Sequence, residues 1–305
     1  MRIGIFGGEV GQGAGGMDEL VQQAAECESQ GFASYWLPQI FGLDALTALA
    51  VVGREVPRIE LGTSVVPTYP RHPMMLAGQA LTTQKASGGR LALGIGLSHQ
   101  IVVESMWGLS FDKPVRHMRE YLSILRPLLY GESVSFRGES ISTSGQLTVD
   151  NPHGAPPILI AALGTQMLNV TGRLADGTIT WMTGPSTLKE HTVPTLRSAA
   201  AAAGRPEAAR IATSLPVCVS DDAAAARDRA ARVFAIYGQL PSYRAMLDRE
   251  GAGGPADVAL VGSEAEVKSG IERLAEAGAT DFIAAEFASS DSERARTRDL
   301  LRSLL

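Results

Sequence analysis

Two neighbouring stretches decide the fold: Arg58-Ile-Glu-Leu-Gly-Thr-Ser-Val-Val-Pro67 and Ser87-Gly-Gly-Arg90-Leu-Ala-Leu-Gly-Ile-Gly96. Each contains a short apolar run with small residues at its end, and a segment of helical periodicity follows, covering 73–86 and 114–130. A continuous apolar run is typical of a parallel strand that is buried on both faces. The two stretches therefore predict consecutive strand–helix units of a parallel sheet.

The same unit recurs along the whole chain. Eight apolar segments each precede a helical segment, at 3–6, 33–37, 58–66, 90–95, 157–161, 178–181, 211–219 and 281–287. Eight such units in 305 residues, a little above the typical length of about 250, predict an α/β fold, a (β/α)8 TIM barrel with insertions.

The extra length is expected in two insertions. Residues 133–150 alternate polar and apolar side chains around Gly138, which is typical of a β-hairpin. Residues 237–262 indicate an added helix and a short strand before the last unit, with 237–243 as a loop over the barrel mouth. Because no Pro/Gly/Ser-rich linker divides the chain, we interpret residues 1–305 as a single domain.

Composition excludes several classes of protein. The chain is 45% apolar, and its 27 basic and 32 acidic residues leave no positive surplus for a nucleic acid. No apolar run approaches the 18 residues or so that span a bilayer, and the first strand starts without a signal-peptide pattern, so we expect a cytoplasmic protein. Cys27 and Cys218 lie in apolar patterns, and without CxxC or HExxH no metal site is predicted.

One glycine motif favours a different fold. Residues 11–16 match GxGxxG, which in a dinucleotide-binding fold begins at the end of the first strand. Here Gly7-Gly8-Glu9-Val10 intervene, and the second strand ends in Leu37-Pro38-Gln39 without a carboxylate. We therefore interpret this segment as the first loop at the mouth of a barrel.

The order of the strand-end motifs is more specific. It runs through Gly62-Thr63, Arg71-His72-Pro73, Gly89-Arg90, Leu93-Gly94-Ile95-Gly96, Ile160-Ala-Ala-Leu-Gly164 and Ala175-Asp-Gly177. Together these motifs resemble the bacterial luciferase-like oxidoreductases, most closely the branch that uses the deazaflavin coenzyme F420. The resemblance implies a luciferase-like TIM barrel, hydride transfer between the deazaflavin and a small organic substrate, and a homodimer.

The resemblance also implies which residues contact the cofactor. In the family the third strand ends in a bulge with a non-prolyl cis peptide under the central ring, and Ser64–Val65 is the matching pair. The helix that follows the fifth strand is expected to bind the phosphate through its free N–H groups, with Leu163 in place of the usual glycine. The remaining implied contacts are Gly96, Leu97, Ser98, His99, Ala162, Gly164, Thr165 and Met167.

Two residues are candidates for the chemistry itself. Where related deazaflavin enzymes often carry aspartate and histidine, this chain has Gln39 and Ile40. Gln39 can hydrogen-bond the polar groups of the ring but is no general base, which favours substrate reduction over alcohol oxidation. His99 stands where some relatives have a proton-donating glutamate, and imidazole titrates near neutrality. A rim histidine without a chemical role is the alternative for His99.

Other side chains carry weaker expectations. Tyr69, Trp107 and Trp181 are candidates for the wall of a substrate pocket, with ordinary core packing as the alternative for each. His72 is expected to cap the third helix. We assign little functional weight to His117, His153 and His191.

Two other functions stay open from the sequence. The same fold serves FMN-dependent luciferase-like monooxygenases, and a barrel that binds deazaflavin without catalysis would carry the same cofactor motifs. Comparing FMN and F420 binding, and testing turnover of ketones, enones and imines, distinguishes the three.

Overall fold

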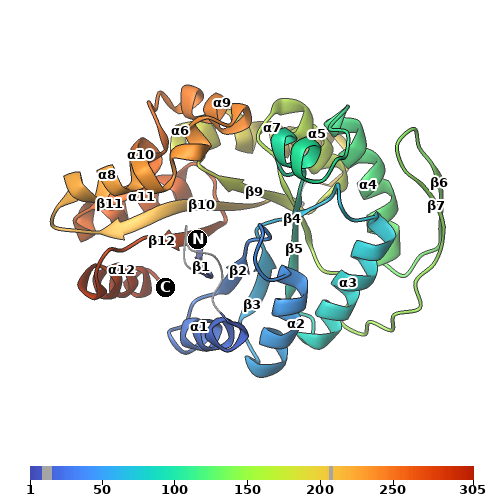
Figure 1. Cartoon of the computed structure of the whole chain (residues 1–305), viewed down its shortest axis with the longest axis horizontal. Helices are drawn as coiled ribbons and strands as arrows, with labels where there is room; N and C mark the ends of the chain where they lie inside the picture. The colour runs from blue at the N-terminus through green and yellow to red at the C-terminus, as the bar shows by residue number, and fades with distance from the viewer. Residues whose placement is uncertain (9–15, 206–208) are drawn as a thin grey trace.

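The structure is a computed structural model that describes residues 1–8, 16–205 and 209–305. Eight parallel strand positions close into a barrel, because the first strand pairs with both the second and the last (Figure 1). In order around the barrel these are β1 (Arg2–Phe6), β2 (Ser34–Leu37), β3 (Glu60–Thr63) continued by β4 (Val66–Pro67), β5 (Leu91–Gly96), β8 (Ile158–Ala161), β9 (Gly177–Trp181), β10 (Arg210–Val219) and β12 (Asp281–Glu286). The predicted (β/α)8 barrel is confirmed.

Helices surround the barrel and begin where the sequence offers caps. Asp44 accepts a hydrogen bond from the Thr47 N–H at the start of α2, and His72 does the same for α3 from Met74, as expected. Pro73 and Pro114 occupy the first turns of α3 and α4. These outer helices are α1 (Met17–Ser29), α2 (Ala45–Glu55), α3 (Pro73–Ala86), α4 (Pro114–Leu129), α5 (Thr165–Leu174), α7 (Val193–Ala202) and α12 (Asp291–Ser303).

Two segments depart from the simple succession of strand and helix. The antiparallel strands β6 (Val134–Arg137) and β7 (Ser142–Gly145) form a hairpin that projects from one side of the barrel (Figure 1). On the opposite side, β10 is followed by α8 (Ala223–Val233), the 3-10 turn η3 (Ala235–Gly238), α9 (Pro241–Glu250), α10 (Pro255–Val258), β11 (Leu260–Gly262) and α11 (Glu264–Glu276).

Two segments differ from the simple pattern of eight strand–helix units. Residues 263–276, for which no element was predicted, form α11, which begins with reciprocal hydrogen bonds between Ser263 and Glu266. The helical segment predicted to follow the strand at 178–181 is divided into the short α6 (Pro185–Thr187), the π-helix η2 (Leu188–Thr192) and α7. Pro194 explains the interruption, because it has no N–H to donate to the preceding turn. A second π-helix, η1 (Val102–Met106), follows β5.

The barrel interior is filled by side chains rather than open. Trp36 is fully buried there, and a Cβ on Gly62 would lie 2.0 Å from its ring, so glycine makes room for the indole. The other members of this interior cluster are Ala92, Leu159, Ile179, Ala212 and Ile283. The barrel is therefore a packed support for whatever lies at its ends.

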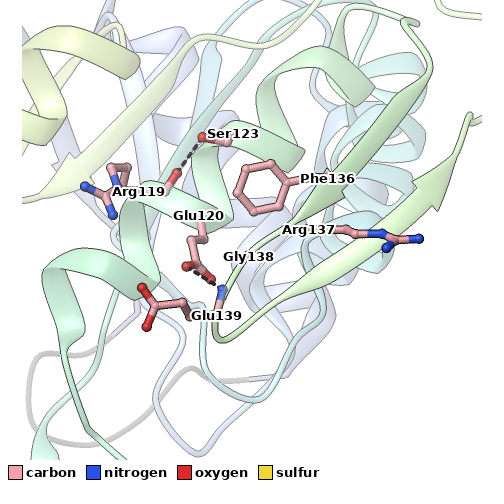
Figure 2. Close-up of a pocket in the computed structure, with 7 residues that line it drawn as sticks. All are labelled: Arg119, Glu120, Ser123, Phe136, Arg137, Gly138 and Glu139. Atoms are coloured by element: carbon pink, nitrogen blue, oxygen red, sulfur yellow. Dashed lines mark hydrogen bonds between the residues drawn. The ribbon is translucent and has the colours of Figure 1, made fainter.

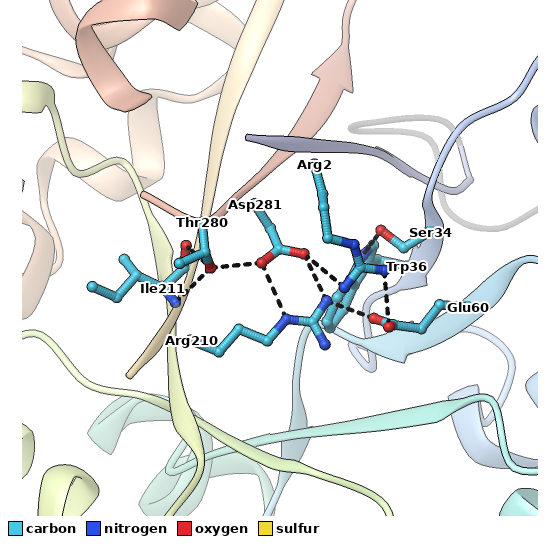
Figure 3. Close-up of polar contacts among 8 residues, drawn as sticks. All are labelled: Arg2, Ser34, Trp36, Glu60, Arg210, Ile211, Thr280 and Asp281. Carbon is cyan, nitrogen blue, oxygen red and sulfur yellow. Dashed lines mark hydrogen bonds and ion pairs between the residues drawn. The ribbon is translucent and has the colours of Figure 1, made fainter. Parts of the chain in front are cut away.

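Charged residues close the N-terminal end of the barrel beneath Trp36 (Figure 3). The Arg210 guanidinium lies 2.7 Å from Asp281 and 2.5 Å from Glu60, and stacks over the Trp36 ring at 5.5 Å. Arg2 pairs with Glu60 at 2.9 Å and with Asp281 at 3.4 Å. Every charge in this network therefore has an opposite partner.

Within the described residues, no helix is both long and apolar enough to cross a membrane.

Candidate active site

The sequence-predicted residues gather at the C-terminal rim of the barrel. Because all the barrel strands run parallel, the residues that follow β2, β3, β5, β8 and β9 share one end of it. Gln39, Val65, His99 and Trp181 are all half-buried there. Most of the GxGxxG segment, residues 11–15, lies outside the described residues.

The third strand is interrupted at this rim. Its pairing with β5 runs to Gly62–Ala92 and resumes at Val66–Ile95, so three residues on one strand face two on the other. This is a β-bulge, and its Ser64–Val65 peptide bond is cis, as the resemblance implied.

Thr63 and Gly94 hold the bulge in place. The Thr63 hydroxyl donates to the Gly94 carbonyl at 2.7 Å and accepts from the Gly94 N–H at 2.9 Å, replacing the lost backbone ladder. A Cβ on Gly94 would lie 1.9 Å from the Thr63 carbonyl oxygen, so only glycine permits this approach. Beyond it, a Cβ on Gly96 would meet Val65 at 2.7 Å and Ala161 at 3.1 Å, which places these three residues side by side.

The fourth strand end carries His99. Ser98 adopts a left-handed backbone with φ of 65°, which turns the chain before the histidine. Leu97 and Ser98 are half-buried beside it. Burial lowers the pKa of His99, so its imidazole is neutral at pH 7. The ring lies 5.7 Å from that of Tyr243 in a tilted arrangement.

Gln39 has one of its two polar groups engaged. Its side-chain oxygen accepts a 2.6 Å hydrogen bond from the Ala45 N–H at the first turn of α2. The carbonyl of the amide is therefore committed to the protein, and its NH2 group is the end available to a ligand.

The segment after β8 presents an open helix start. Gly164 is the N-cap of α5, and no side chain caps this helix. Gly164 and Thr165 are exposed, so the first-turn N–H groups face solvent at the rim and can bind an anion. The side chains of Ala162 and Met167 belong to the hydrophobic core, which leaves only their backbone groups for a ligand.

One residue at this segment was missed by sequence reasoning. His191, in η2, lies 2.8 Å through its Nε2 from the carbonyl oxygen of Leu163. The two residues are 28 positions apart, and the helical pattern after the strand predicted at 178–181 gave no sign that they meet. Pro194 was the available signal, because it predicts a disturbed turn just before it.

Aromatic side chains from the insertion cover part of the rim. Trp181 stacks on Phe6 at 6.1 Å and meets Tyr237 edge-on at 5.6 Å. Tyr237 in turn meets Tyr243 at 5.2 Å, which continues the cluster to His99. The 237–243 segment is therefore η3 and the start of α9 rather than the expected loop, and it lies against rim residues.

The carboxylate of Glu250 fixes α9 to the barrel. It accepts hydrogen bonds from the N–H groups of Ser186 and Thr187, at 3.0 and 2.7 Å, at the start of α6. The insertion is thus anchored directly after the end of β9.

The other two pocket candidates lie in different surroundings. Tyr69 stacks on His117 at 4.1 Å and on Phe111 at 5.2 Å, and its buried hydroxyl makes no hydrogen bond within the described residues. Burial raises the pKa of Tyr69 to about 12, helped by Asp112 and Glu104. Trp107 ends η1 and is half-buried.

A hollow outside the barrel has a structural explanation. It lies between α4 and the β6–β7 hairpin, lined by Arg119, Glu120, Ser123, Phe136, Arg137, Gly138 and Glu139 (Figure 2). Glu120 accepts hydrogen bonds from the N–H groups of Glu139, Ser140 and Ile141 at 2.9–3.0 Å. Its carboxylate is therefore used to hold the hairpin turn. Across 1–8, 16–205 and 209–305, no group of three His, Cys, Asp or Glu side chains is arranged to hold a metal ion.

Comparison with known proteins identifies the family. The family model for luciferase-like monooxygenases matches residues 1–286. The chain belongs to the luciferase-like monooxygenase family. Within it, the chain is 28% identical over 235 residues to the 5,10-methylenetetrahydromethanopterin reductase of Methanolobus tindarius, covering 76% of this chain and 71% of that protein.

Two further luciferase-like relatives extend the comparison. The F420-dependent glucose-6-phosphate dehydrogenase of Mycolicibacterium gilvum is 34% identical over 203 residues, covering 61% of this chain and 60% of that protein. The solved structure of the coenzyme F420-dependent tetrahydromethanopterin reductase from Methanopyrus kandleri superposes with a TM-score of 0.81 at 19% identity, covering 99% and 98% of the two chains. That likeness concerns the fold.

Proposed function

We propose that this chain is a coenzyme F420-dependent oxidoreductase that transfers a hydride between the deazaflavin and a small organic substrate, acting as a reductase. The observation that carries the proposal is the placement of the Val65 bulge and the open start of α5 on either side of β5. Neighbouring strands are about 4.8 Å apart, so β4 and β8, the strands that adjoin these two features, are roughly 10 Å apart. The relatives that use F420 by name support the choice of cofactor.

The residues present fit such a cofactor at both of its ends. The uncapped first turn of α5 supplies N–H donors for a phosphate without any basic side chain. Val65, Gly96 and Ala161 form a small apolar surface suited to the face of a flat ring. When bound, the deazaflavin supplies the hydride-transferring carbon, while the protein supplies position and polarity.

Gln39 and His99 would act on the ring and the substrate. The free NH2 group of Gln39 can donate to an acceptor on the ring, but it takes up no proton. His99 can give a proton to the reduced substrate when its imidazole is charged. Since burial lowers the pKa of His99, that form is populated only on the acid side of its usual titration.

Titration with cofactors tests this proposal. The purified chain is titrated with F420 and with FMN while fluorescence is followed, and reduced F420 is then oxidised in the presence of ketones, enones and imines. We expect F420 to bind more tightly than FMN and to turn over with at least one substrate. Tight FMN binding with substrate-dependent oxygen uptake would show a monooxygenase instead, and F420 binding without turnover of any compound would favour a binding protein.

We further propose that two copies of the chain associate. The apolar side chains of Ile40, Phe41 and Met75 are 60–65% exposed, and the 2.6 Å ion pair between Arg71 and Asp44 joins the two segments that carry them. Exposed apolar groups of this kind mark protein contacts. Sedimentation should show a dimer for the wild type and a monomer for Phe41→Asp; a monomeric wild type would refute the proposal.

A further inference from the structure

His191 is not a strand-end residue, yet it touches the segment that would bind the phosphate. We propose that His191 is a positioning residue that orients the Leu163–Gly164 peptide so that the Gly164 N–H points at the phosphate of the cofactor. The inference rests on the proposed function, since it concerns the same phosphate site.

The contact is specific and buried. The His191 side chain belongs to a residue that is 8% exposed, and its Nε2 is 2.8 Å from the Leu163 carbonyl oxygen. A carbonyl oxygen only accepts hydrogen bonds, so Nε2 must carry the proton. The imidazole therefore holds this carbonyl in one direction.

Peptide geometry converts that contact into a direction for the neighbouring N–H. The Leu163–Gly164 bond is trans, and in a trans peptide the C=O and N–H bonds point to opposite sides. Because the Leu163 carbonyl points at His191, the Gly164 N–H points away from it. Gly164 is exposed and is the N-cap of α5, so this donor faces the open rim.

The local backbone explains why an external residue is useful here. Gly164 has an extended conformation, with φ of −80° and ψ of 152°, and no side chain caps the helix behind it. Leu163 does not have a positive φ, so the backbone does not need the glycine that the family resemblance implies at this position. Nothing within the turn itself therefore fixes the peptide plane, and the hydrogen bond from His191 does so.

The π-helix places His191 for this contact. In η2 the Val193 N–H donates to Leu188 O, which is the i→i+5 spacing of a π turn. Such a turn contains one more residue than an α-helical turn and is frequent at functional sites. The wider turn carries His191 on the side of the helix that faces α5.

A comparison of two deazaflavins tests the proposal. Wild type, His191→Ala, His191→Gln and the control His153→Ala, which changes an exposed loop histidine, are titrated by fluorescence with F420 and with its phosphate-free riboflavin-level analogue. We expect wild type to prefer F420, and His191→Ala to lose about ten-fold in F420 affinity, the typical effect of one misplaced hydrogen bond to a charged group. Affinity for the phosphate-free analogue should be unchanged. His191→Gln, whose amide can donate to the same carbonyl, should restore part of the preference.

The ratio of the two affinities separates positioning from folding, because a partly unfolded variant loses both equally. A His191→Ala protein that keeps the wild-type ratio, or that loses affinity for both compounds alike, overturns the role of His191 while leaving the proposed function intact. A wild type that binds neither deazaflavin refutes the proposed function, and the role of His191 with it.

Discussion

Polar groups are paired with one another at the N-terminal end of the barrel, whereas several at the C-terminal rim have no protein partner. At the N-terminal end, Asp281 is 2% exposed and lies between Arg2 and Arg210, with Glu60 completing the network. Burial alone would lower the pKa of Arg210, but hydrogen bonds and charge from Asp281 and Glu60 raise it above its ordinary value. The pairing is complete without any ligand.

The C-terminal rim leaves comparable groups without protein partners. The first turn of α5 has no side-chain cap, and the buried hydroxyl of Tyr69, two residues after β4, makes no hydrogen bond within the described residues. Ser98 and Met182, which follow β5 and β9, both have positive φ. Buried polar groups are normally paired, so unpaired donors and unusual backbone at one end indicate where a ligand completes the structure.

Removing Arg210 breaks the closed end and should have the largest effect. Arg210→Leu leaves the buried Asp281 with the Thr280 hydroxyl and the more distant Arg2 as partners, and we expect a loss of about 3–5 kcal/mol in the free energy of unfolding, measured with urea. In the folded fraction, F420 affinity should be unchanged. The control Lys268→Ala removes an exposed pair with Glu272 and should change stability by less than about 0.5 kcal/mol. Equal effects of the two variants would contradict this account.

The second prediction concerns the bulge at the rim. Gly94→Ala forces a methyl group against the Thr63 carbonyl, so we expect stability to fall by about 3 kcal/mol and F420 affinity to fall with it. Gly78→Ala is the matched control, because its Cβ would meet no atom within 4 Å in α3; it should gain about 0.5–1 kcal/mol. Wild-type binding in Gly94→Ala would show that the rim does not depend on this close approach.

The pH dependence of turnover tests whether His99 donates a proton at the rim. A group whose pKa is lowered is charged only below its usual value, here 6.5, so reduction of substrate should speed up as the pH falls below that value. His99→Ala should abolish this acid limb and reduce turnover at acid pH about a hundred-fold. The control His153→Ala should keep the limb. A profile that instead rises toward alkaline pH and depends on His99 would indicate a base and the oxidative direction.

The smallest effect is expected at Glu120, which belongs to neither end. Burial raises its pKa, but hydrogen bonds from three backbone N–H groups outweigh this and lower it overall. A lowered carboxyl pKa stabilises the fold at neutral pH, and that contribution is lost as the pH falls below about 4.5 through the lowered value. Glu120→Gln should cost about 2 kcal/mol at pH 7 and show a flatter acid dependence than wild type. Glu276→Gln changes an exposed side chain and should unfold in urea like wild type, both at pH 7 and below about pH 4.5.

The barrel could be predicted because its strands are buried on both faces and so leave continuous apolar runs. The helix α11 escaped prediction although Ser263 and Glu266 form a capping box, since its place in the fold depends on β11. After Ser214, the last partner of β9, β10 continues and pairs with β11 instead, from Val217 onward. No local sequence pattern predicts that β10 changes its neighbour from β9 to β11.

The candidate site could be predicted only in part, because some of its contacts depend on tertiary structure. The local apolar runs predict where the strands end, and the family resemblance implied that Gln39, Ser64–Val65 and His99 are the functional residues at those ends. The contact between His191 and Leu163 depends instead on how η2 turns, and that of Tyr243 with His99 on how the insertion folds back. Both are tertiary consequences of segments whose own patterns look like ordinary helices.

The pairing of β10 with β11 has a consequence for the protein in solution. A closed barrel has no unpaired strand edge, but β11 adds one outside the closure. An exposed edge can recruit strands from other molecules and start aggregation. Here that edge is three residues long, is buried, and has α8 and α11 packed against it. The added strand is thus too short and too well covered to serve as a template.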